Sequence, residues 1–248
     1  MTAADRILVL VHAFPFGPGM WAPQVDAFPG WRVVTPPLPG FDGHPLAAER
    51  TMDAYAQDVL AGLDAMRIER AVFCGLSLGG YVLFGVLRQA PHRVAGLVLA
   101  DTRTSIDTPD RRAARQRSVE VARTQGAAAI ADEMLPNVLG ATTRAGRPDV
   151  VAHARSLIEA QPAETIAAGL EAMMDRPDSS DVLRRVACPT AIVVGEEDTV
   201  TPVSDAGQMH ALVTGSTLAT IPRAGHMANL EAPAAFNDAV RALLARLP

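Results

Sequence analysis

Short runs of mostly apolar residues recur along the chain and are separated by segments with apolar residues at helical spacing. The first run, Ile7–Val11, is apolar on both faces, which is typical of a strand buried in a parallel sheet. The runs that we interpret as strands cover residues 6–11, 31–35, 71–74, 94–100, 190–194 and 217–221.

Helical spacing is clearest after the second of these strands. Thr51 suits an N-cap, and Met52, Tyr55, Val59, Leu63 and Met66 then recur on one face. Further helices are expected over residues 20–28, 81–87, 203–212 and from 233 onward. Strands that alternate with helices in this way predict a doubly wound parallel sheet.

The alternation stops between residues 104 and 185, where the pattern indicates helices and no convincing strand. Thr108 and Pro109 are typical of an N-cap and a first helical position. Helices are expected from there to about residue 124, over 127–135 and 149–160, and from residue 162. Because strands resume at Thr190, we interpret residues 104–185 as a helical insertion in one α/β core made of residues 1–103 and 186–248.

The third strand leads into the sequence Gly75-Leu76-Ser77-Leu78-Gly79 and then into an apolar helix. Strand, tight turn and helix together are the context that a nucleophile elbow requires. Glycines on either side of Ser77 allow the strand and the helix to approach closely while the serine takes a strained conformation. We therefore expect the Ser77 hydroxyl to be a nucleophile.

A serine hydroxyl attacks only when a base removes its proton, and that base must itself be oriented. His226 follows the last predicted strand, and Asp198 follows the strand before it. Both therefore belong at the carboxyl edge of the sheet, where open α/β sheets bind ligands. The order Ser77, Asp198, His226 along the chain is also the one expected with this type of elbow.

Other carboxylates compete with Asp198 for the role of the acid. Glu196 and Glu197 lie closer to the end of the same strand, and Asp101 ends another strand at the same edge. Taken singly, an aspartate in this position caps a helix more often than it orients a histidine. The order of the three residues favours Asp198, and the alternatives stay open.

Ester cleavage also needs hydrogen-bond donors for the oxyanion and side chains that shape a pocket. The backbone N–H of Leu78 is one donor, and the loop at Phe14, after the first strand, is the natural place for another. Side chains that could line an acyl or alcohol pocket, with core packing as their alternative role, are Phe16, Trp21, Met134, Leu135 and Met173.

Composition and charge argue against several other classes of protein. Hydrophobic residues make up 49% and charged residues 20% of the chain, the net charge is −5, and no basic run suggests nucleic acid. No apolar run has the length of a membrane span, and no signal peptide is recognisable, so a cytoplasmic protein is expected. Cys74 and Cys188, in or beside strands, are interpreted as buried thiols. The oligomeric state is left open.

No cofactor is expected either. No cluster of histidine, cysteine and aspartate residues has the spacing of a metal site. The glycines around Ser77 do not form a dinucleotide fingerprint, and no Walker lysine is present. The expected partner is a small-molecule ester or lactone.

Four motifs together carry a family resemblance: His12-Ala13-Phe14-Pro15, Gly75-Leu76-Ser77-Leu78-Gly79-Gly80, Gly195-Glu196-Glu197-Asp198 with Pro202, and Gly225-His226. With them the sequence resembles the α/β-hydrolase family over nearly its whole length. The segment from Ser77 to Tyr81, with Asp101-Thr102-Arg103, is most similar to small carboxylesterases and 3-oxoadipate enol-lactonases.

The resemblance implies an α/β-hydrolase fold, with a mainly parallel sheet, helices on both faces and a helical cap over the active site. It implies Ser77 as nucleophile, His226 as base, Asp198 as its orienting acid, and an oxyanion hole from Phe14 and Leu78. The chain begins at what looks like the family's third strand, so the N-terminal antiparallel hairpin is expected to be absent. The loop at residues 36–40 also departs from the family's usual Asp-x-x-Gly.

We therefore predict a serine hydrolase, a carboxylesterase for small to medium acyl esters. A lactonase for a carboxylate-bearing lactone is an alternative, motivated by Arg111, Arg112, Arg115 and Arg117 in the first cap helix. At 3.6 residues per turn, Arg111 and Arg115 share a face from which Arg112 is rotated by about 100°, and most of the four are expected to face water. A third possibility is a ligand-binding protein that keeps the fold without turnover.

Overall fold

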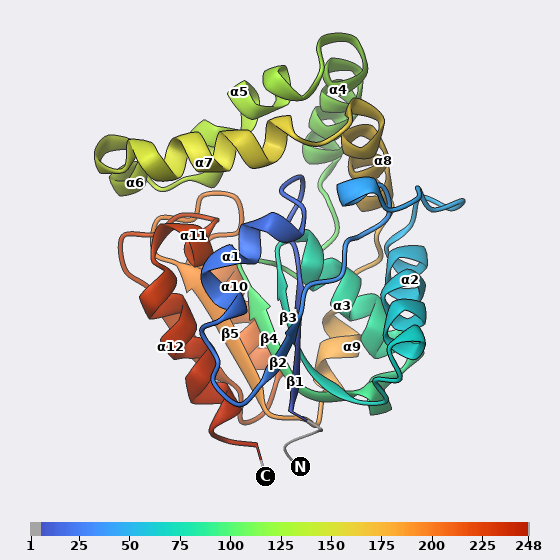
Figure 1. Ribbon diagram of the computed structural model, residues 1–248, viewed down its shortest axis with the longest axis vertical. Coiled ribbons are helices and arrows are strands. Elements are labelled where there is room, and N and C mark those ends of the chain that lie inside the picture. Colours follow the sequence, from blue (N-terminus) through green and yellow to red (C-terminus); the bar gives the residue numbers. More distant parts are fainter. Residues whose placement is uncertain (1–5, 248) are drawn as a thin grey trace.

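A six-stranded sheet lies at the centre of the computed structural model, which describes residues 6–247 (Figure 1). The strands are β1 (Ile7–Val11), β2 (Arg32–Val34), β3 (Ala71–Leu76), β4 (Val94–Ala100), β5 (Thr190–Gly195) and β6 (Thr217–Ile221). Their order is β2-β1-β3-β4-β5-β6, and every pairing is parallel. The predicted parallel sheet is confirmed. The expected absence of an N-terminal hairpin concerns residues before β1, of which only Arg6 is among the described residues.

Burial explains why the central strands are so visible in the sequence. Every residue of β1, β3, β4 and β5 is buried, whereas the edge strands β2 and β6 are mostly half-buried or exposed. A strand covered by helices on both faces needs apolar side chains at consecutive positions. Both cysteines are free thiols, and Cys74 is buried as predicted. Cys188 is only half-buried, because it precedes β5 and does not lie within the sheet, so the prediction of full burial is wrong for it.

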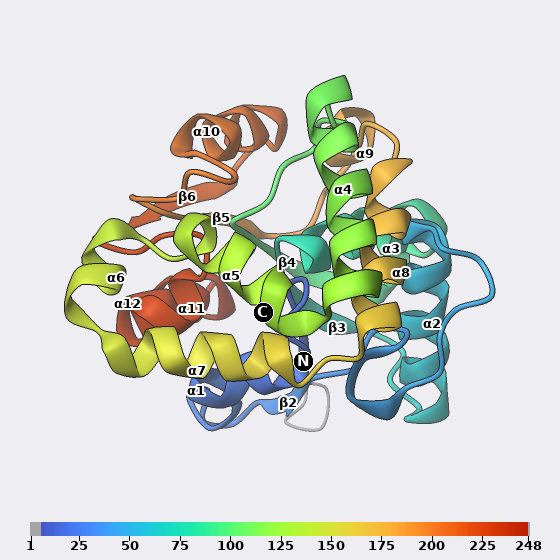
Figure 2. The ribbon, with the colours of Figure 1, turned by 90° about the horizontal axis from the view of Figure 1, so that it is seen from above.

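Helices cover both faces of the sheet (Figures 1 and 2). One face carries α1 (Ala22–Val25) and α12 (Pro233–Leu244). The other carries α2 (Met52–Ala65), α3 (Leu78–Gln89), α9 (Ser180–Arg184) and α10 (Val203–Leu212). Thr51 caps α2 as predicted, because its hydroxyl accepts the N–H of Ala54 at 3.1 Å. No helix within residues 6–247 has the length and apolar character to cross a membrane.

The helix predicted over residues 20–28 is wrong as a continuous element. The chain forms a 3-10 turn, η2 (Pro18–Trp21), followed by the single turn of α1, which ends at Val25. Trp21 and Gln24 are buried here, and Val25 is exposed. A short kinked segment of this kind keeps apolar residues near helical spacing without forming a regular helix.

Five helices of the segment 104–185 lie together above the carboxyl end of the sheet (Figure 1). They are α4 (Pro109–Gln125), α5 (Ala127–Val138), α6 (Ala141–Gly146), α7 (Pro148–Glu159) and α8 (Ala163–Met174). Thr108 caps α4 through its hydroxyl, which accepts the N–H of Arg111 at 3.3 Å. The last helix of the segment, α9, packs against α3 and α10 of the core. The division of the chain at residues 104 and 185 stays a prediction.

Candidate active site

Ser77 lies at the junction where β3 passes directly into α3. Its backbone has φ 53° and ψ −109°. Residues other than glycine rarely adopt this conformation, which is typical of a strained turn. A Cβ atom on Gly75 would overlap the backbone of Gly79, and one on Gly79 would overlap the carbonyl of Val11. Both glycines are therefore needed for the close approach of strand and helix, as the sequence predicted.

Three predicted residues are in direct contact. The Nε2 atom of His226 lies 2.8 Å from the Ser77 hydroxyl, and its Nδ1 atom lies 2.8 Å from Oδ2 of Asp198. Because a carboxylate only accepts, the imidazole proton belongs on Nδ1, and Nε2 is left to accept the hydroxyl proton. The chain separations are large, so the contacts arise from the sheet, which brings the loops after β3, β5 and β6 to one edge.

Asp198 is held as an ionised carboxylate. Its Oδ1 accepts the N–H groups of Val200 at 2.8 Å and Thr201 at 2.9 Å, and its Oδ2 accepts the Thr201 hydroxyl at 2.6 Å. Burial by itself raises a carboxyl pKa, but His226 and the bonds from Thr201 outweigh it, so the pKa of Asp198 is lowered. A charged acceptor therefore faces the imidazole.

The two competing glutamates point elsewhere. Glu196 accepts the backbone N–H of Arg223 at 3.0 Å. Glu197 accepts the backbone N–H of Thr142 at 2.8 Å and also bonds the hydroxyl of that residue, so it contacts the start of α6 in the segment above the sheet. Within residues 6–247 neither glutamate bonds His226, and Asp198 is the carboxylate that bonds the imidazole.

Asp101 is buried at the end of β4 with a backbone φ of 43°. Its Oδ1 accepts the N–H of Gly195 at 2.7 Å, which ties β4 to the end of β5. Burial raises its pKa well above the usual value, and the negative charge of nearby Asp198 raises it further. The charged form of Asp101 is therefore disfavoured in the folded protein, and its observed contact is with the backbone.

The two predicted oxyanion donors lie at the same edge of the sheet. Leu78 is the first residue of α3, so its N–H has no acceptor within the helix. Phe14 follows β1, and its ring packs against Gly169 of α8, where a Cβ atom would overlap it. The use of these two N–H groups as an oxyanion hole stays a prediction.

The predicted pocket residues are mostly buried. Phe16, Trp21, Leu135 and Met173 are buried, and Met134 is half-buried against the core. The ring of Trp21 lies 5.9 Å from that of Phe236, which is core packing between η2 and α12. Their role in binding substrate stays a prediction.

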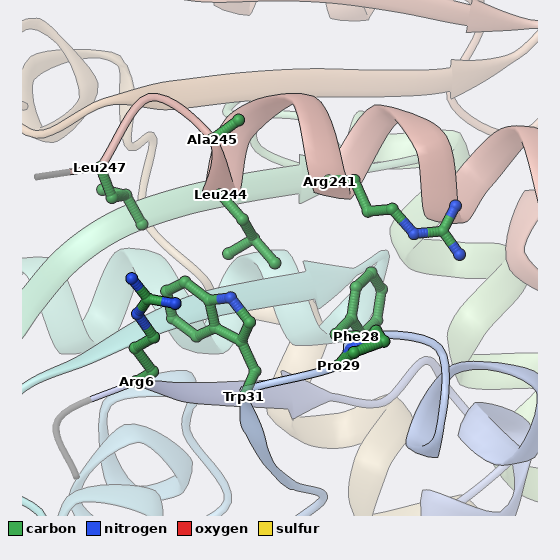
Figure 3. A pocket seen from close by; sticks show the side chains of 8 residues that line it. All are labelled: Arg6, Phe28, Pro29, Trp31, Arg241, Leu244, Ala245 and Leu247. Atoms are coloured by element: carbon green, nitrogen blue, oxygen red, sulfur yellow. The ribbon is translucent and has the colours of Figure 1, made fainter. Parts of the chain in front are cut away.

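A separate hollow of about 360 Å³ lies at the amino end of the sheet (Figure 3). It is lined by Arg6, Phe28, Pro29, Trp31, Arg241, Leu244, Ala245 and Leu247. Trp31 precedes β2, and Leu247 follows α12, so the hollow is at the opposite end from Ser77. None of the predicted site residues lines it.

Glu231 is a residue that the sequence reasoning missed. Its Oε1 accepts the N–H groups of Gly225 at 3.0 Å and Met227 at 3.1 Å, one on each side of His226. Its Oε2 accepts the N–H of Gly140, between α5 and α6, at 2.8 Å. The carboxylate therefore fixes the histidine loop and joins it to the helices above the sheet. The available signal was an acidic residue between the apolar Leu230 and Ala232, just before Pro233.

His12 supports the loop that carries Phe14. Its Nε2 accepts the N–H of Leu38 at 3.1 Å, its Nδ1 donates to the carbonyl of Ala13 at 3.0 Å, and its ring lies edge-on to Phe41 at 4.7 Å. The residue is fully buried, and burial lowers its pKa to about 4 against a small opposing effect of the Ala13 carbonyl. A neutral imidazole thus links the loops after β1 and β2.

This buried imidazole predicts a loss of stability in mild acid. In the unfolded chain a histidine takes up a proton below about pH 6.5, whereas folded His12 stays neutral down to about pH 4. The His12 contribution is therefore complete above pH 6.5 and is lost as the pH falls toward 4, by about 3 kcal/mol in the free energy of unfolding. Urea denaturation between pH 7 and pH 4 measures it.

Carboxylates also titrate in this range, so variants are needed to isolate the effect. His12→Gln is expected to lower stability at pH 7 but to flatten its dependence on pH. The exposed His153, replaced by glutamine, serves as the matched control with an unchanged slope. An unchanged slope in His12→Gln would contradict the assignment to His12.

The contacts at the sheet edge bring together a serine hydroxyl, an imidazole and a carboxylate, the three groups that acyl transfer by a serine nucleophile requires. The catalytic roles of Ser77, His226 and Asp198 stay a prediction. Within residues 6–247 no three histidine, cysteine, aspartate or glutamate side chains are grouped so that they could hold a metal ion.

The alpha/beta hydrolase family model matches residues 8–239, and the chain belongs to this family. It is 30% identical to 3-oxoadipate enol-lactonase 2 of Acinetobacter baylyi over 195 residues, which are 79% of this chain and 71% of that protein. It is also 30% identical over 238 residues to pimeloyl-[acyl-carrier protein] methyl ester esterase of Aromatoleum aromaticum, covering 91% and 93% of the two chains.

Solved structures agree with this assignment. A thermophilic esterase from Thermogutta terrifontis, with malate bound, superposes with a TM-score of 0.93 at 34% identity and covers 97% of this chain and 89% of its own. The resemblance drawn from the sequence, to esterases and enol-lactonases of the α/β-hydrolase family, is confirmed, and the protein is a hydrolase by family.

Proposed function

We propose that this hydrolase is a serine carboxylesterase for small to medium acyl esters. The observation that carries the proposal is the unbroken line of contacts from the Ser77 hydroxyl through both nitrogens of His226 to Asp198, with 2.8 Å at each end of the imidazole. Relatives and structural neighbours named as esterases support the choice of ester over other hydrolysable bonds.

In the proposed reaction His226 takes the hydroxyl proton as Ser77 attacks the ester carbonyl. The oxyanion of the tetrahedral intermediate accepts hydrogen bonds from the N–H groups of Phe14 and Leu78. His226, now an imidazolium stabilised by Asp198, gives its proton to the departing alkoxide and leaves an acyl-enzyme. Water, deprotonated by the same histidine, then attacks the acyl group, and collapse of the second intermediate returns the proton to Ser77 and frees the acid.

Lactone hydrolysis is the second candidate, and the similarity to 3-oxoadipate enol-lactonase 2 favours it. The covalent chemistry is the same, except that the leaving alkoxide stays tethered to the acyl group. The difference between the two candidates must therefore come from the shape and charge of the binding region. We propose that the helices of residues 104–185 form the cap that supplies much of this region.

A serine-directed phosphonate tests the proposal directly. We expect one equivalent to add to the intact protein, the modified peptide to contain Ser77, and turnover of a short-chain aryl ester to stop in proportion. The Ser77→Ala variant should take up no phosphonate. Labelling without turnover of any ester or lactone in a panel would favour a binding protein on this fold, and labelling at another serine would contradict the site.

A further inference from the structure

A groove of about 410 Å³ lies where α4 meets the core. Figure 2 shows α4 standing beside the segment that links it to β4. The groove is lined by Tyr81, Arg103, Asp107, Arg111, Ala114, Arg115, Asn137, Thr199 and Val200. Its walls thus carry three arginines against one aspartate, in a protein whose net charge is −5.

Arg103 is the first sign that the groove takes an anion. Its side chain is only 8% exposed, yet its guanidinium contacts a single carboxylate within residues 6–247, that of Asp205, at 3.3 Å. No hydrogen bond is formed across this contact, since Oδ2 of Asp205 has no partner in the described residues. A guanidinium has five donors, and an arginine buried to this degree is normally saturated by acceptors. Arg103 therefore has donors to spare in the wall of the groove.

Arg115 and the aspartate of the groove are already satisfied. The buried carboxylate of Asp107 accepts Nε of Arg115 at 2.6 Å and Nη2 of Arg176 at 2.9 Å. Burial raises its pKa, but the two arginines outweigh this and lower it, so Asp107 is ionised. Arg176 also lies over the ring of Tyr81, at 4.2 Å from its centroid. With two guanidinium groups around one carboxylate, this cluster remains positive.

Arg111 supplies a second guanidinium group with available donors. It shares a helical face with Arg115, as predicted, and both line the groove. It is exposed and forms no ion pair in the part of the chain that the structure describes. Arg112, rotated away from that face, instead bonds Asp175 at the end of α8. The expectation that most of the α4 arginines face water is correct, but one water-exposed face is also a wall of the groove.

The groove adjoins the proposed catalytic residues. Tyr81 lies one turn after Ser77 on α3, about 6 Å along the helix axis, and its N–H donates to the Ser77 carbonyl at 3.3 Å. Val200, in the opposite wall, donates its N–H to Asp198 at 2.8 Å. The groove therefore lies beside the elements that carry Ser77 and Asp198.

We propose that this groove binds a carboxylate of the substrate, through the guanidinium groups of Arg103 and Arg111, while the scissile ester or lactone carbonyl lies at Ser77. The planar fork of arginine donors matches a carboxylate, and two guanidinium groups that form no hydrogen bond within residues 6–247 favour an anion over a neutral group. The inference rests on the proposed function and narrows its substrates to acid esters or lactones with a free carboxylate.

A matched pair of esters tests this proposal. For each linear diacid of about four to eight carbons, the monomethyl ester keeps one carboxylate, and the dimethyl ester does not. We expect kcat/KM to favour the monoester by about tenfold or more at one chain length, as for a charged hydrogen bond of about 1.5–3 kcal/mol. Arg111→Ala should abolish that preference, and Arg111→Lys should restore part of it. Arg117→Ala, on the same helix but outside the groove, should keep it.

Equal or higher kcat/KM for the dimethyl esters at every length would overturn the groove assignment, and the esterase proposal would stand. A preference that survives Arg111→Ala, and also survives Arg103→Gln in a protein of unchanged thermal stability, would place the carboxylate elsewhere and equally overturn it.

Binding measurements keep the groove testable even if no ester is turned over. Calorimetric titration of Ser77→Ala with the free diacid is expected to show binding that weakens by about tenfold or more in the Ser77→Ala/Arg111→Ala protein. Inorganic phosphate at the same ionic strength is the comparison. No binding of any diacid would overturn the proposal, and so would equally tight, Arg111-dependent binding of phosphate, since the site would then be a general oxyanion site.

Discussion

Replacing Ser77 with alanine is expected to lower kcat/KM for an ester by about a thousandfold or more and to leave the fold intact. Nucleophile and base act as a unit, so removal of the hydroxyl abolishes the covalent route and leaves the weak catalysis of the remaining site. Alanine is smaller than serine, and the backbone strain at φ 53° is the same for both residues. Steady-state kinetics and a thermal melt measure the two effects.

The half-buried Ser118 on α4, whose hydroxyl bonds Glu133, provides a matched control. Ser118→Ala should retain the activity of the unmodified protein. Turnover by Ser77→Ala that is comparable to the unmodified protein, at equal thermal stability and without contaminating esterase, would show that Ser77 is not the nucleophile.

Asp198→Asn is expected to reduce kcat by about a thousandfold to ten-thousandfold, whereas Asp101→Asn should cost less than about tenfold. An amide at position 198 can no longer hold the proton on Nδ1 of His226 or stabilise the imidazolium. At Asp101, in contrast, burial raises the pKa well above the usual value and disfavours the charge, so replacing the carboxyl group with an amide should matter little. Its asparagine analogue keeps an oxygen for the N–H of Gly195.

The comparison requires kcat for both variants with the same ester, together with thermal melts that show each to be folded. The assignment of the acid fails if the two losses are equal or if Asp101→Asn loses more. In that case the functional carboxylate would be the one after β4.

The local pattern of apolar and polar residues was sufficient to predict the sheet and most of the long helices. The central strands are apolar on both faces because helices cover both sides, and that pattern is visible without any tertiary information. The missed helices α6, α9 and α11 (Ala228–Glu231) have six, five and four residues, too few for helical periodicity to show. The wrong helix at residues 20–28 has the right spacing, but its chain turns at η2 before a second helical turn is complete.

Some residues of the candidate site could likewise be predicted from local pattern, and others could not. Ser77, Asp198 and His226 could be found because each follows a strand, and parallel strands end at one edge. The status of Asp101 could not be decided from sequence, since its burial and its contact with Gly195 are tertiary facts. The spacing of four residues placed Arg111 and Arg115 on one face of α4. The groove that this face lines depends on how α4 packs against the core, which the sequence does not show.

The role of Glu231 could not be predicted from the sequence either. Its carboxylate accepts three N–H groups, and these come from positions as far apart in the chain as Gly140 and Gly225. The backbones of these two glycines also lie too close together for a Cβ atom on either. The histidine loop and the helices above the sheet are therefore joined through one buried carboxylate and one glycine contact, and an acceptor left without its donor there would cost about 1–3 kcal/mol.

Energetic coupling through a shared group is reciprocal. A ligand that steadies the helices above the sheet therefore also steadies His226, and a change that disorders the His226 loop loosens those helices. The contacts of Glu231 and of Gly140 with Gly225 also limit which segments can be exchanged between members of the family. A chimera that combines this core with the corresponding helices of another family member keeps an ordered histidine loop only if the donor segment brings a backbone N–H, and no side chain, to the position of Gly140.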